Sequence, residues 1–187
     1  CYLLAYCGQE TFKAVAPIAG LTMEWMPQEF KRTRKIPLFE IHGTNDKVSE
    51  WTGDLQNKGG WGAYIAVPDA VEYWVRRNGC RKELVETLPL KGDGAHQVIT
   101  HKFVGKKNAP QVWLYEVVDG VHSWFNEDMD TAGEIWKFFS MYLVSSRYIP
   151  YLYTLNILLI RPTKKVLFTV AMLMGLCLTA YAQKEPI

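Results

Sequence analysis

Residues 36–46 read IPLFEIHGTND, an apolar run that ends in a glycine-containing turn and an aspartate. A short apolar run bounded by turn residues is typical of a buried strand, so we expect a strand over residues 36–42. Asp46 follows this strand directly. In an open α/β sheet the chemistry lies at the carboxyl ends of the strands. Asp46 is therefore a candidate functional residue.

Strand and helix patterns alternate on both sides of this stretch. Apolar or alternating runs predict further strands over residues 12–20, 96–104 and 111–118. Helical patterns occupy residues 1–10, closing near Gly8, and residues 68–77 and 131–144. This alternation predicts an α/β fold, with a mostly parallel sheet covered by helices on both faces.

Two of the expected helices have distinct end signals. Pro68 and Asp69 suit the first turn of one, since proline fits there and an acid complements the helix dipole. Asn78-Gly79 is a strong stop for the same helix. Asp130 or Thr131 caps the other. Its apolar face is expected to comprise Ile135, Trp136, Phe138, Phe139 and Leu143.

His122 occupies a loop after the expected strand 111–118, just as Asp46 follows the strand 36–42. The chain order Asp then His is that of an α/β-hydrolase triad once a serine has come earlier. A serine hydroxyl needs a neutral imidazole to take its proton, and the imidazole needs a carboxylate to fix its tautomer. We therefore expect Asp46 and His122 on neighbouring loops, with an oxygen-to-nitrogen distance of about 2.6–3.2 Å.

A series of motifs over roughly residues 1–143 resembles the C-terminal half of the polyhydroxybutyrate depolymerase / feruloyl esterase family of secreted α/β-hydrolases. The turn HGTND is shared by many α/β-hydrolases, whereas the tryptophan helix that ends in NGC, placed between that turn and GVHSW, is more specific. The motifs are FKAVAPIAG (12–20), PLFEIHGTND (37–46), AVEYW with NGC (70–74 and 78–80), GVHSW (120–124) and IWKFF (135–139).

The resemblance assigns roles to individual residues. It implies that Asp46 is the triad acid, that His122 is the triad base, and that Trp124 is an aromatic side chain beside the catalytic loop that contacts substrate. His42 matches a turn histidine that we interpret as structural, and Trp74 is expected in the core. The family's Gly-x-Ser-x-Gly elbow would fall just before Cys1, so the α/β-hydrolase fold is expected to be incomplete at its N-terminus.

None of the chain's own serines is expected to be the nucleophile, because none lies in such an elbow. The 187 residues alone are therefore expected to lack esterase activity, whereas a longer parent chain would have it. The serines concerned are Ser49, Ser123, Ser140, Ser145 and Ser146.

The function expected from the resemblance is that of a serine carboxylic-ester hydrolase. Its substrate would be a feruloyl or acetyl ester of plant polysaccharide, or a polyhydroxyalkanoate polyester, and no cofactor is implied. The net charge of +2 argues against a nucleic-acid partner. The alternative function is a non-catalytic α/β-hydrolase-like binding module that its tail anchors to a membrane.

The four cysteines, at positions 1, 7, 80 and 177, lack the spacing of a zinc site, so no metal is expected. If the parent is secreted, as the resemblance implies, Cys80 can form a disulfide with Cys7 or with a cysteine outside this chain. The sequence does not choose between these partners.

Residues 148–187 differ from residues 1–147, which we interpret as a partial hydrolase domain. Only five charged residues lie in this tail. Within it, RPTKK (161–165), a 13-residue apolar run and an Ala-x-Ala site resemble a bacterial signal peptide at the wrong end of the chain. Three interpretations stay open: a foreign segment joined by a sequence-assembly error, a membrane anchor, or a buried hairpin. The protein is expected to be secreted or periplasmic, or membrane-anchored if the tail is genuine.

Overall fold

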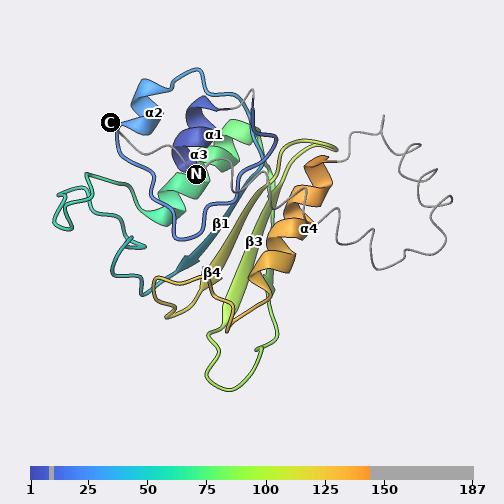
Figure 1. The fold of residues 1–187 in the computed structure, drawn as a ribbon. Coiled ribbons are helices and arrows are strands. Elements are labelled where there is room, and N and C mark those ends of the chain that lie inside the picture. Colours follow the sequence, from blue (N-terminus) through green and yellow to red (C-terminus); the bar gives the residue numbers. More distant parts are fainter. Residues whose placement is uncertain (9–10, 144–187) are drawn as a thin grey trace, which may run out of the picture. The chain divides into compact units, whose positions relative to one another are not determined.

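The computed structural model describes residues 1–8 and 11–143 (Figure 1). The expectations for residues 148–187 lie outside the described residues. Four strands form one sheet in the order β1-β4-β3-β2. The elements are α1 (Tyr2–Cys7), α2 (Met26–Glu29), β1 (Leu38–Gly43), α3 (Val67–Asn78), β2 (Lys82–Thr87), β3 (Val98–Val104), β4 (Val112–Val117) and α4 (Thr131–Leu143).

The sheet is mixed, so the expected mostly parallel sheet of an α/β-hydrolase is wrong. Only β1 and β4 pair in parallel, whereas β3 is antiparallel to both β4 and β2. The connections explain this difference. Parallel neighbours need a long crossover, which the chain supplies between β1 and β4, whereas the short loops that join β2 to β3 and β3 to β4 produce antiparallel pairs.

Two short elements were not expected from the sequence. All six residues of β2 are exposed, so the strand lacks the alternation of apolar and polar residues that indicates a half-buried strand. The helix α2 has only four residues, too few to show a helical period.

Residues 12–20 form no full strand, contrary to expectation. Val15 and Ile18 each make an isolated parallel bridge to β1, opposite Leu38 and Ile41. Pro17 between them has no amide proton to donate. This segment therefore covers the free edge of β1 without extending the sheet by a regular strand.

The helices α1 and α3 pack against one face of the sheet. Tyr6 of α1 lies against Trp74 of α3, with ring centroids 4.9 Å apart, and both side chains are buried beside Leu38 and Leu114. The helix α3 ends as expected, because Gly79 adopts the left-handed conformation (φ 75°) that a side chain would disfavour. Trp74 is a core residue, as predicted.

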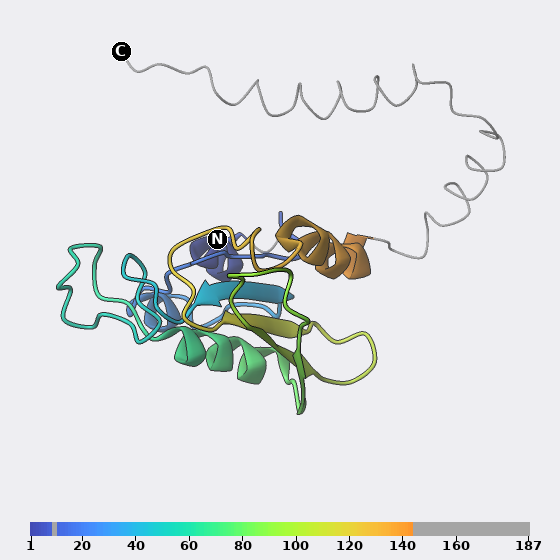
Figure 2. The same cartoon turned by 90° about the horizontal axis from the view of Figure 1, so that it is seen from below.

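The helix α4 covers the opposite face (Figure 2). Phe138 is fully buried against Phe39 of β1 and Trp113 of β4. The expected apolar face of α4 was partly wrong, because the side chains of Trp136 and Leu143 are 64% and 58% exposed. The stripe that packs is centred on the buried Phe138, and at about 3.6 residues per turn Trp136 and Leu143, two and five positions away, point away from it. Its members are Ile135, Phe138, Phe139 and Tyr142.

Candidate functional site

The parallel pairing of β1 with β4 brings two loops to one edge of the sheet. In this register Gly43, the last residue of β1, lies opposite Val117, the last residue of β4. The turn after β1 is then tied to the turn after β4. The amide of Thr44 donates to the carbonyl of Val117, and the amide of Asn45 donates to the carbonyl of Gly120, both at 3.0 Å.

Gly43 permits this close approach. A Cβ atom at this position would lie 2.2 Å from the carbonyl oxygen of Gly120, a backbone atom that cannot turn aside. The glycine of the HGTND turn therefore has a packing role. It lets the backbone before Asp46 touch the backbone before His122.

The expected hydrogen bond between Asp46 and His122 is present. The Nδ1 atom of His122 lies 2.8 Å from Oδ2 of Asp46. The Asp46 side chain is fully buried, whereas that of His122 is 45% exposed. Because a carboxylate only accepts, Nδ1 of His122 carries the proton. No described residue hydrogen-bonds its Nε2, which is left to act as a base.

The turn that follows Asp46 holds the carboxylate in place. The amides of Val48 and Ser49 donate to Oδ1 at 2.8 and 2.9 Å, and the hydroxyl of Ser49 donates to Oδ2 at 2.9 Å. Burial alone would raise the pKa of Asp46, but these hydrogen bonds and the one from His122 outweigh it, so the pKa lies below its ordinary value. Asp46 is therefore ionised at neutral pH.

Ser49 belongs to this turn and is not placed as a nucleophile. Its hydroxyl is buried between Oδ2 of Asp46 and the carbonyl of Ala19, which lies 3.0 Å away. It lies 3.3 Å from Nδ1 of His122, on the side of the imidazole that faces the acid. A nucleophile has to meet Nε2 instead. The sequence offered one signal for this role: a serine three residues after an aspartate is common in Asp-stabilised turns.

A second buried acid and imidazole adjoin the turn, and sequence reasoning missed the acid. Glu40 and His42 are both fully buried, with Oε1 and Nδ1 2.8 Å apart. The Nε2 atom of His42 lies 2.7 Å from the carbonyl of Ser49 and 3.6 Å from Oδ2 of Asp46. Residues two apart on a strand share a face, so the spacing of Glu40 and His42 was the available signal.

Burial and hydrogen bonding act in opposite directions on this pair. Burial raises the pKa of Glu40 and outweighs the hydrogen bonds from His42 and from the Gly20 amide. Burial would lower the pKa of His42, but the hydrogen bond and charge of Glu40 raise it above the ordinary value.

Trp124 lies two residues after His122, in the loop that precedes α4. The next residue, Phe125, is buried, and its φ of 57° lies in the left-handed region. The carbonyl of Trp124 accepts a hydrogen bond of 2.7 Å from the hydroxyl of Thr131. The indole is 64% exposed, so a contact between Trp124 and substrate stays a prediction.

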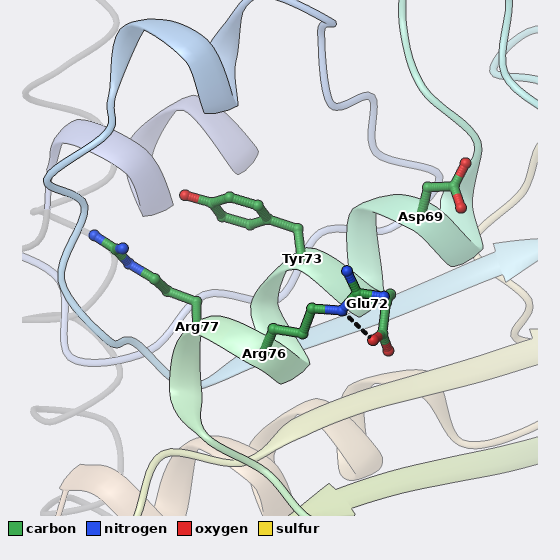
Figure 3. A pocket seen from close by; sticks show the side chains of 5 residues that line it. All are labelled: Asp69, Glu72, Tyr73, Arg76 and Arg77. Carbon is green, nitrogen blue, oxygen red and sulfur yellow. Dashed lines mark hydrogen bonds and ion pairs between the residues drawn. The ribbon is translucent and has the colours of Figure 1, made fainter.

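One cavity, of about 560 Å³, lies on α3 and not at the Asp46–His122 pair. Figure 3 shows that its five lining side chains all project from this helix. Arg76 pairs with Glu72 at 2.5 Å, and Arg77 donates to the backbone carbonyl of Thr33. The arginines are thus engaged within the chain, and the hollow is a charged surface groove. The lining residues are Asp69, Glu72, Tyr73, Arg76 and Arg77.

Residues 1–8 and 11–143 contain no cluster of three or more His, Cys, Asp or Glu side chains placed to hold a metal ion. Over the same ranges, no helix combines the length and apolarity needed to cross a membrane. Cys7 and Cys80 are free thiols, so the structure does not join them.

No protein-family model matches the chain, and no curated protein matches it significantly.

Proposed function

We propose that Asp46 and His122 are the acid and the general base of a serine carboxylic-ester hydrolase. The observation that carries this proposal is the 2.8 Å hydrogen bond between a buried, ionised carboxylate and the Nδ1 atom of a half-exposed imidazole. This arrangement leaves Nε2 without a hydrogen-bond partner among the described residues, so that it can accept a proton as a general base must.

In the proposed reaction His122 moves one proton twice. Its Nε2 takes the proton from a serine hydroxyl as the serine oxygen attacks the ester carbonyl, and the Asp46 carboxylate stabilises the resulting imidazolium. The imidazolium then protonates the departing alcohol and leaves an acyl-serine. Water, activated by the same Nε2, hydrolyses that ester and restores the serine.

The nucleophile in this proposal lies outside the described residues, because no described hydroxyl meets Nε2 of His122. The resemblance to polyhydroxybutyrate depolymerases and feruloyl esterases supports a feruloyl, acetyl or hydroxyalkanoate ester as substrate. The substrate would reach the open side of His122, beside the exposed indole of Trp124.

The test begins with the coding sequence upstream of the Cys1 codon, which we expect to encode a Gly-x-Ser-x-Gly elbow. The encompassing chain is then expressed and assayed with p-nitrophenyl acetate. We expect the His122→Ala variant to lose at least about 10³-fold in kcat.

A matched control is available in His96, which also pairs with a buried aspartate. Its Nδ1 lies 2.9 Å from Oδ1 of Asp128. We expect the His96→Ala variant to keep kcat within about threefold, the range of a change that does not touch the transition state. Equal losses in the two variants, or an upstream sequence without the elbow, would overturn the proposal. The latter result would favour the non-catalytic binding module.

A further inference from the structure

Glu40 is an acid at a position where an apolar side chain would serve packing better. Its strand, β1, is buried along its whole length, and Glu40 itself is fully buried. Burying an ionisable pair costs desolvation energy, and apolar replacements of such pairs are often neutral or stabilising. Stability alone therefore gives little reason for Glu40 and His42 to occupy this strand.

The imidazole of His42 is held at both of its nitrogen atoms. The carbonyl of Ser49 can only accept, so Nε2 of His42, at 2.7 Å, carries a proton and donates it. Nδ1 is fixed at 2.8 Å by Oε1 of Glu40, which in turn accepts the amide of Gly20 at 3.1 Å. The ring therefore has one orientation, and that orientation aims a donor at the turn after β1.

Ser49 connects the fixed imidazole of His42 to the Asp46 carboxylate by hydrogen bonds on both sides. It accepts from His42 through its carbonyl, and it donates its amide to Oδ1 and its hydroxyl to Oδ2 of Asp46. We infer that Glu40 and His42 are positioning residues, which set the Asp46 carboxylate, through Ser49, at the angle that holds His122 in its Nδ1–H tautomer. This inference rests on the proposed function.

The surroundings of the pair limit what else can act on it. Two titratable groups face it, Tyr2 of α1 and Asp46 of the turn. The pKa of Tyr2 is raised, first by burial and then by the charge of Glu40. The ring of Trp51 lies edge-on, 6.0 Å from that of His42. An apolar replacement of the pair would pack among these aromatic rings.

The test replaces the pair in the double variant Glu40→Leu/His42→Phe and measures the tautomer of His122. Long-range ¹H–¹⁵N NMR spectra of the labelled 187-residue chain give the ratio of Nδ1–H to Nε2–H. Thermal unfolding gives the stability. We expect the unfolding midpoint to be retained and the ratio to fall about fivefold, as the loss of one net hydrogen bond predicts. The Glu40→Gln variant, which removes only the charge, should lower the ratio in the same direction.

Glu134→Gln is the matched control, because Glu134 accepts a 2.7 Å hydrogen bond from Tyr115 on the opposite face of the sheet. This control should leave the ratio of His122 tautomers unchanged. An unchanged ratio in the folded double variant would overturn the inference. If the double variant does not fold, an unchanged ratio in Glu40→Gln overturns it instead. The Asp46→Asn variant separates the two proposals: if it too leaves the ratio unchanged, the proposed function fails.

Discussion

The two halves of the sheet differ in burial and in what they carry. Every residue of β1 is buried, whereas every residue of β2 is exposed. β1 and its parallel neighbour β4 lead into the turns that hold Asp46 and His122. β2 forms an edge of the same sheet and carries no part of the candidate site. The comparison shows that the candidate site lies at the ends of the most buried strands of the sheet.

The difference in burial between β1 and β2 follows from what packs against each strand. β1 lies between β4 and the segment that contains Val15 and Ile18, with helices packed on both faces. The edge strand β2 instead carries Lys82, Glu83 and Glu86, and charged side chains at an edge oppose pairing with another chain.

The largest effect is expected for Phe39→Ala in β1. Phe39 is fully buried against Trp113, Tyr115 and Phe138, so the variant should lose about 3–5 kcal/mol of unfolding free energy. The matched variant Leu84→Ala in β2 removes a side chain that is 39% exposed and should cost less than about 1 kcal/mol. Urea unfolding measures both. Similar losses would remove the contrast between the two strands.

Gly43→Ala comes next. Its added Cβ would lie 2.2 Å from the Gly120 carbonyl oxygen and has to push the two loops apart, at a cost of about 1–3 kcal/mol. Gly92, in the loop between β2 and β3, has no atom within 4 Å of its would-be Cβ, so Gly92→Ala should change stability by at most about 0.5 kcal/mol. Equal stability of the two alanine variants in urea unfolding would show that the loops do not need their close contact.

A smaller effect is expected in the pH dependence of the unfolding free energy. The pKa of Asp46 is lower in the folded chain than its ordinary value of 3.8. Its contribution to stability is therefore present above pH 3.8 and is lost as the pH falls through the folded-state pKa. The difference in unfolding free energy between the wild type and Asp46→Asn should shrink on acidification below that pH. Parallel pH curves for the two proteins would contradict the hydrogen-bonding account of this carboxylate.

The smallest effect is expected at the exposed edge. Glu86 of β2 and Lys102 of β3 form an ion pair at 3.6 Å, with the glutamate side chain 67% exposed. Glu86→Ala should cost at most about 0.5 kcal/mol, and added salt should reduce that cost further. A loss comparable to that of Gly43→Ala in the same unfolding assay would mean that β2 is as constrained as the turns after β1 and β4.

Sequence patterns predicted the strands that consist of apolar runs and the helices that have an apolar face or clear end signals. β1, β4, α3 and α4 follow from apolar runs and helix end signals, and the position after a buried strand pointed to Asp46. β2 left no pattern, because a fully exposed strand has no alternation to detect. The direction of pairing depends on how the connections run in space, which no local pattern encodes.

The candidate site was predictable only in part. Asp46 and His122 were found because each follows a strand. The roles of Ser49 and Glu40 depend on hydrogen bonds that form only after the turn has folded onto β1, so the spacings of Asp46 to Ser49 and of Glu40 to His42 were signals too weak to predict these roles on their own. The nucleophile and the role of Trp124 stay predictions.

The site of protonation of His122 in the labelled 187-residue chain tests the pairing of Asp46 with His122. Long-range ¹H–¹⁵N spectra, recorded above the titration of the imidazole, distinguish Nδ1–H from Nε2–H. The 2.8 Å bond to Asp46 predicts that the proton resides on Nδ1 and that Asp46→Asn lowers this population. A proton on Nε2 in the wild type, or the same populations in the wild type and the variant, would contradict the assignment of Asp46 and His122 as an acid–base pair.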